Sequence, residues 1–78
     1  MRAYILLRVS PQHTAGLMKG LKGESGIRRA NLIHGPYDCL LEVNGKDLEA
    51  INDTVFRIRE REGVLETMTC LVVQSWKR

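Results

Sequence analysis

Strand-like and helix-like patterns follow one another along this chain in an order that only a few small folds can accommodate. Runs rich in apolar and β-favouring residues predict four strands, at residues 3–9, 27–34, 38–44 and 64–76. Apolar residues at helical spacing predict two helices, at residues 11–22 and 47–61. The order is strand, helix, strand, strand, helix, strand. This is the ferredoxin-like α+β arrangement, whose strands form a four-stranded antiparallel sheet.

Turn and cap residues support these boundaries. Ser10 and Pro11 suit a helix start, because serine caps helix N-termini and proline is tolerated at the first helical position. Asp47 can cap the second helix, and Gly63 can end it. A chain of 78 residues has room for one domain. We therefore treat residues 1–78 as a single domain.

The first strand is apolar on both sides. Alternate residues of a strand point to opposite faces, so Ala3, Ile5 and Leu7 share one face while Tyr4 and Leu6 share the other. Two helices can cover only one face of an open four-stranded sheet. An uncovered apolar face usually marks an interface. We expect a second copy of the chain to cover it, which gives a homodimer like a dimeric α+β barrel.

Composition and charge exclude several classes of function. The net charge of +3 comes from basic residues spread along the sequence, whereas a nucleic-acid surface needs a clustered stripe. No apolar run is long enough for a secretory signal core or a membrane span. Cys39 and Cys70 would lie roughly 10 Å apart across the sheet, too far for a disulfide. We expect a cytoplasmic protein without a metal or a cofactor.

The turn between the second and third strands is the most informative stretch for a binding site. Gly35 allows unusual backbone angles and close approach of a ligand to its N–H group. Pro36 stiffens the turn, Tyr37 offers a flat apolar wall with a hydroxyl, and Asp38 offers an anion for an ammonium group. The alternative is an ordinary hairpin turn in which Asp38 only caps the turn and binds no ligand.

Three further residues are candidates for the same site. Thr67 and Thr69 stand two apart in the last strand and could present two hydroxyls on one face, although β-branched residues also simply fill strands. His34 precedes the turn and could contact a ligand there. We find no paired carboxylates and no nucleophile beside a base, so catalysis is not indicated.

An ordered set of short motifs resembles a known family. The set comprises Gly35-Pro36-Tyr37-Asp38, Asp47-Leu48, Gly63-Val64 and Thr67-Met68-Thr69. It is similar to the effector-binding (RAM) domain of the Lrp/AsnC transcription regulators, over residues 3–74. The resemblance implies a ferredoxin-like domain that dimerises through its sheet, with dimers assembling into an octamer or a similar ring.

The resemblance also implies a ligand and a place for it. Effectors of this family, commonly amino acids, bind between dimers near the loop after the second strand. Carried over, Gly35, Tyr37 and Asp38 line the site, and Thr67 and Thr69 lie near it. Many members have threonine where this chain has His34. The helix-turn-helix domain that usually precedes the module is not in this sequence, so we expect a stand-alone version without specific DNA binding.

Three functions remain open. The first is an amino-acid-sensing and oligomerisation module that acts on transcription, with a full-length Lrp/AsnC regulator as a further partner. The second is an oligomerisation module without a ligand. The third is a small dimeric α+β barrel enzyme, for which His13 and His34 are the only prominent acid–base candidates. We favour the first, a non-enzymatic role without a membrane partner.

Overall fold

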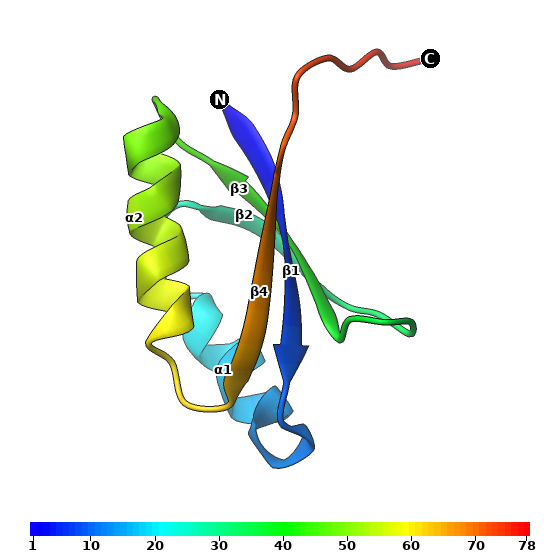
Figure 1. The fold of residues 1–78 in the computed structure, drawn as a ribbon, viewed down its shortest axis with the longest axis vertical. Coiled ribbons are helices and arrows are strands. Elements are labelled where there is room, and N and C mark those ends of the chain that lie inside the picture. The colour runs from blue at the N-terminus through cyan, green and yellow to red at the C-terminus, as the bar shows by residue number, and fades with distance from the viewer.

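The computed structural model describes residues 1–78 as one four-stranded sheet with both helices on the same face (Figure 1). Its elements in chain order are β1 (Arg2–Val9), a 3-10 turn (Pro11–His13), α1 (Thr14–Leu21), β2 (Ile27–Leu32), β3 (Cys39–Asn44), α2 (Leu48–Arg59) and β4 (Val64–Leu71). The strand order is β2-β3-β1-β4, and every pair is antiparallel. The ferredoxin-like prediction is confirmed.

Every helix and strand after β1 is shorter than the sequence pattern predicts, and the difference is largest in α1 and β4. The first helix becomes α-helical only at Thr14, because the Ser10 carbonyl accepts from the His13 N–H at 2.9 Å and forms a 3-10 turn. The Ser10 hydroxyl donates to Gln12 and caps nothing. The pattern predicts a last strand that reaches residue 76, but β4 ends at Leu71. It ends there because its partner β1 begins at Arg2 and offers no further residues to pair with.

The core fills the space between the sheet and the two helices. Residues on one face of β1 and β3 are buried together with residues on the inner sides of α1 and α2. The fully or nearly fully buried apolar side chains are Ala3, Ile5, Leu7, Val9, Leu17, Leu21, Cys39, Leu41, Val43, Ile51, Val55 and Ile58. Each larger side chain contributes about 1.5–3 kcal/mol when it leaves water. Of the two faces of the first strand, the one with Ala3, Ile5 and Leu7 is therefore the inner face.

The ends of α2 follow the predicted signals. The Asp47 side chain accepts a hydrogen bond from the Ala50 N–H at 2.9 Å, which satisfies one of the unpaired donors at the helix start. After the helix, Gly63 has a φ of 92°, which residues with a Cβ rarely adopt. The His13 side chain also packs where a Cβ of residue 63 would stand. The turn from α2 into β4 therefore requires glycine.

The second face of the sheet carries no helix. Tyr4 and Leu6 of β1 point to it, and the strand register places Leu40, Met68 and Cys70 on the same side. Met68 is 44% exposed, and Leu6 is half-buried. We call this surface the open face. Cys39 lies on the covered face and Cys70 on the open face, and both are free thiols, as predicted.

An ion-pair network joins the turn after α1 to α2. Glu24 accepts from Arg57 Nε at 2.9 Å and from Arg61 Nη2 at 3.1 Å, and its side chain is only 12% exposed. The hydrogen bond from Arg57 is the largest cause that lowers the pKa of Glu24 below its ordinary value of 4.5, although burial opposes it. The charged carboxylate is therefore favoured in the folded state.

This network predicts a pH-dependent contribution to stability. A lowered folded-state pKa contributes stability that is fully present above 4.5 and is lost as pH falls through the folded value. Glu24→Gln should lower the free energy of unfolding by about 1–2 kcal/mol near pH 7, because the two arginines lose their charged acceptor. The loss stays this small because solvent screens the half-exposed Arg57. In urea titrations the difference from the unsubstituted protein should be smaller well below pH 4.5 than at pH 7.

The matched control is Glu60→Gln, because Glu60 is exposed and forms no ion pair. It should change stability little at either pH. A Glu24→Gln deficit of the same size at both pH values would contradict the electrostatic role of Glu24.

Candidate functional site

The loop between β2 and β3 projects from the sheet on the side away from α2 (Figure 1). His34, Gly35 and Pro36 are exposed, and Gly35 has a φ of 155°. The backbone N–H groups of His34, Gly35 and Tyr37 donate to no backbone acceptor in the chain. Free N–H groups close together in an exposed loop can hold an anion such as a carboxylate.

Tyr37 turns from this loop over the open face. Its hydroxyl donates to Glu66 Oε2 at 3.5 Å and lies 3.9 Å from Met68 Sδ, and both residues belong to β4. The Arg8 guanidinium lies 5.4 Å from the centre of the Tyr37 ring, and Arg8 Nε pairs with Glu66 Oε1 at 3.2 Å. Tyr37 therefore connects the loop to the far strand of the sheet.

Asp38 fastens the loop to the end of β1. Its N–H donates to the Leu7 carbonyl at 2.8 Å, and its Oδ2 accepts from the Val9 N–H at 2.7 Å. This is the structural role that the sequence left open as the alternative to ligand binding. The second oxygen, Oδ1, forms no hydrogen bond within the chain. The carboxylate therefore holds the loop with one oxygen and keeps the other available.

The two threonines lie on the opposite side of the sheet from Tyr37. Thr67 pairs with Leu7, and Thr69 pairs with Ile5, so both point to the covered face at the outer strand. Thr67 lines a hollow of about 480 Å³ together with Arg59. Within one protomer, His34, Gly35, Tyr37 and Asp38 lie together, whereas Thr67 and Thr69 do not join them.

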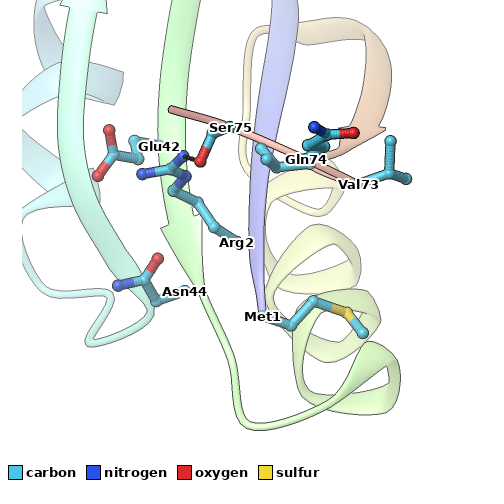
Figure 2. Close-up of a pocket in the computed structure, with 8 residues that line it drawn as sticks. Met1, Arg2, Glu42, Asn44, Val73, Gln74 and Ser75 are labelled. Atoms are coloured by element: carbon cyan, nitrogen blue, oxygen red, sulfur yellow. Dashed lines mark hydrogen bonds between the residues drawn. The ribbon is translucent and has the colours of Figure 1, made fainter. Parts of the chain in front are cut away.

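A second hollow lies at the other end of the open face and was not found from the sequence. The C-terminal tail crosses the sheet there, and the Arg2 guanidinium donates to the Ser75 hydroxyl at 3.2 Å (Figure 2). The hollow measures about 550 Å³ and is also lined by Glu42 and Asn44. The C-terminal tail is held in place by the Val72 N–H, which donates to the Arg2 carbonyl at 3.0 Å.

This hollow brings together a cation and an anion that form no ion pair with each other. Arg2 and Glu42 could therefore contact opposite charges of one small polar molecule. The signal in the sequence was weak: both residues stand at open-face positions of their strands, but only the pairing of Arg2 with Asn44 in the β1–β3 register makes them neighbours.

The remaining chemistry of the chain is limited. No group of three or more His, Cys, Asp and Glu side chains is arranged to hold a metal ion. Burial, together with the charge of the neighbouring Asp38, raises the pKa of the Cys39 thiol, which keeps it neutral. No helix has the length and apolar character needed to cross a membrane.

Comparison with known proteins identifies relatives over nearly the whole chain. The family model described as "Lrp/AsnC ligand binding domain" matches residues 2–78. The HTH-type transcriptional regulator LysM of Sulfurisphaera tokodaii is 31% identical over 77 residues, which are 97% of this chain and 55% of the regulator. The chain thus spans about half the length of the curated regulators that it matches.

One relative is of another kind. Homocitrate synthase of Saccharolobus islandicus is 32% identical over 63 residues, which are 81% of this chain but only 14% of the enzyme. The similarity therefore concerns a small segment of that enzyme.

Solved structures agree with the family match. TTHA0845 from Thermus thermophilus superposes with a TM-score of 0.91 at 28% identity, over 99% of this chain and 98% of that one. Escherichia coli AsnC superposes with a TM-score of 0.89 over 95% of this chain and 51% of its own, and at 17% identity it supports the fold alone. The family model, the regulators and the fold agree with the motifs at residues 35–38, 47–48, 63–64 and 67–69, and the chain belongs to the Lrp/AsnC ligand binding domain family.

Proposed function

We propose that this domain senses an amino acid and couples its binding to assembly with other copies of the chain. Its family is that of the ligand-binding domains of transcription regulators. The observation that carries the proposal is the set of free N–H groups in the loop at residues 34–37 beside the free oxygen of Asp38. An α-amino acid presents a carboxylate and an ammonium group close together.

Each charge of the amino acid has a partner in the loop. The N–H groups of His34, Gly35 and Tyr37 bind the carboxylate. Asp38 Oδ1 accepts from the ammonium group, in a charge-assisted hydrogen bond about twice as strong as a neutral one. The imidazole of His34 and the ring of Tyr37 contact the side chain of the amino acid and select its size.

The site is completed between copies of the chain. Thr67 and Thr69 of the same protomer lie on the other face of the sheet from Tyr37. We infer that the threonine hydroxyls reach the ligand from a neighbouring subunit in a higher assembly of dimers, such as an octameric ring. Binding then stabilises the assembly, because the ligand contacts two subunits at once.

The two kinds of relative support sensing over catalysis. The matching segment is about half of a DNA-binding regulator but a small part of an enzyme. A module found in both a regulator and an enzyme supplies a property that the two can share, which is either a response to a small molecule or a contact between subunits. A plain oligomerisation module would supply only the contact between subunits. The free polar groups of the loop favour a response to a small molecule.

The setting of this activity is also a proposal. We place the domain in the cytoplasm, where it acts on transcription through a full-length Lrp/AsnC regulator and does not itself recognise a DNA sequence. Among its basic residues, Arg8, Arg57 and Arg61 are engaged in ion pairs.

Asp38→Asn tests the ligand site. The asparagine side-chain carbonyl can still accept from the Val9 N–H, so the loop stays fastened while the charge is lost. We expect a screen of the twenty amino acids by calorimetry to identify a ligand, and Asp38→Asn to bind it about tenfold more weakly. Urea denaturation should give a free energy of unfolding close to that of the unsubstituted protein.

Asp38→Ala serves as the comparison, because it removes both the charge proposed to bind the ammonium group and the acceptor that fastens the loop to Val9. It should lose affinity and also about 1–3 kcal/mol of stability, since the buried donor of Val9 loses its acceptor. Equal affinity in the unsubstituted protein and a folded Asp38→Asn variant would remove Asp38 from the site. The absence of any amino acid ligand would leave only the oligomerisation role.

The open face supports the proposed dimer. Leu6 stands at its centre, directly paired with Leu40 on one side and Met68 on the other. A stable interface buries about 800 Å² on each partner, against a surface of 5567 Å² for one protomer. A dimer through this face would therefore cover about one seventh of each protomer's surface.

Leu6→Glu should separate the dimer into protomers, because it would bury an unpaired charge at the centre of the interface. Sedimentation at micromolar concentration should then show a species near 8.9 kDa. Phe56→Glu is the matched control, since Phe56 is exposed on α2 on the other side of the sheet. If the unsubstituted protein already sediments as a protomer, the dimer proposal is wrong.

A further inference from the structure

Residues 72–78 form a C-terminal tail that lies beside the open face. β4 ends at Leu71, and the tail continues from it without helix or strand. It bends away from the helices and crosses the end of the sheet on the open-face side (Figure 1 and Figure 2). A second copy that covered the open face would therefore meet the tail as well as the sheet.

The tail is held at two points. The Val72 N–H donates to the Arg2 carbonyl at 3.0 Å, and Arg2 Nη2 donates to the Ser75 hydroxyl at 3.2 Å. Arg2 belongs to the open face, because it stands two residues before Tyr4 in β1. Chain ends without such contacts are usually poorly ordered. Since Trp76 directly follows Ser75, these hydrogen bonds place it beside the open face.

Two apolar side chains of the tail have no cover within the protomer. Val73 is 95% exposed and Trp76 is 74% exposed, more than any other large apolar residue of the chain. The Arg78 guanidinium lies 4.9 Å from the centre of the Trp76 ring, and the rest of the ring faces solvent. Single apolar residues on a surface are common. A tryptophan fixed beside an uncovered apolar face, however, is typical of the residues that anchor interfaces.

The protomer's own sheet offers the tail little apolar surface. The side chains that the sheet contributes to the hollow beneath the tail are those of Arg2, Glu42 and Asn44, which are all polar. The apolar part of the open face, around Leu6 and Met68, lies further along the strands. The exposed side chains of the tail therefore need a surface from outside the protomer.

We propose that the tail is an arm that docks on a second copy of the chain, with Trp76 as its anchor. The inference rests on the proposed dimer through the open face and names a residue that holds this dimer together. In a two-fold dimer each arm contacts the other copy, so every contact is made twice. The arm is separate from the loop at residues 34–38 and does not depend on the proposed amino acid.

The size of the contact shows why one residue matters. A tryptophan side chain buries about 150–250 Å² when it is covered. A stable interface of standard size buries about 800 Å² on each partner. Trp76 alone would therefore supply roughly a fifth to a third of what each copy buries. Its removal should weaken the dimer more than the loss of an average contact.

Trp76 is the only tryptophan in the chain, so its fluorescence reports on the arm directly. In the unsubstituted protein at micromolar concentration, its emission should lie at shorter wavelength than in the Leu6→Glu protomer. Acrylamide should also quench it less. Dilution to nanomolar concentration should move both signals toward those of Leu6→Glu, in step with the dissociation seen by sedimentation.

Trp76→Ala tests the contribution of the arm to the dimer. It should raise the dissociation constant of the dimer about tenfold or more, as loss of an anchor residue does. Phe56→Ala is the matched control, because Phe56 is an exposed aromatic residue on the other side of the sheet. It should leave the dissociation constant within about twofold of the unsubstituted value.

The outcomes separate the arm from the dimer on which it rests. A dimer whose Trp76 emission and quenching equal those of Leu6→Glu would overturn the arm and leave the dimer intact. Emission at short wavelength in both proteins would place Trp76 on its own protomer, and a shift seen only with anionic lipid vesicles would place it on a membrane; either result would overturn the proposal. A chain that sediments as a protomer at micromolar concentration would overturn both the dimer and the arm.

Discussion

Strand β1 is the part of the domain to which every other functional element is attached. It lies between β3 and β4, and its inner residues Ile5 and Leu7 are fully buried beneath the helices. Its far end holds the loop at residues 34–38, because the Val9 N–H donates to Asp38 Oδ2. Its near end holds the C-terminal tail through Arg2. A strand with buried residues on one face and paired neighbours on both edges is among the parts of a domain that open least readily.

The local patterns of the sequence were enough to predict the fold. Alternation along β1 separated its two faces, and the signals at Asp47 and Gly63 marked both ends of α2. The ends of the strands depend on pairing between distant segments, which local patterns do not contain. Thus β4 stops at Leu71, because the residue opposite, Ala3, is nearly the first of β1.

The candidate site was predicted less completely for the same reason. Gly35 and Tyr37 could be assigned to a turn from neighbouring residues alone. The contact between Asp38 and Val9 joins positions 29 apart and became evident only from the packing of the loop on β1. The faces of Thr67 and Thr69 likewise follow from their register with Leu7 and Ile5, which spacing within β4 cannot provide.

The contacts of the loop offer a physical route from a ligand to the open face. Tyr37 reaches Glu66 and Met68 of β4, and Glu66 in turn pairs with Arg8. A ligand that draws on the Tyr37 ring or on the free oxygen of Asp38 competes with, or strengthens, these contacts. Met68 is part of the open face. A change in its contact with Tyr37 would therefore alter the surface that a second copy would meet. Under the proposed function, these side chains in direct contact would couple sensing to assembly, and by linkage the assembly would affect ligand affinity to the same extent.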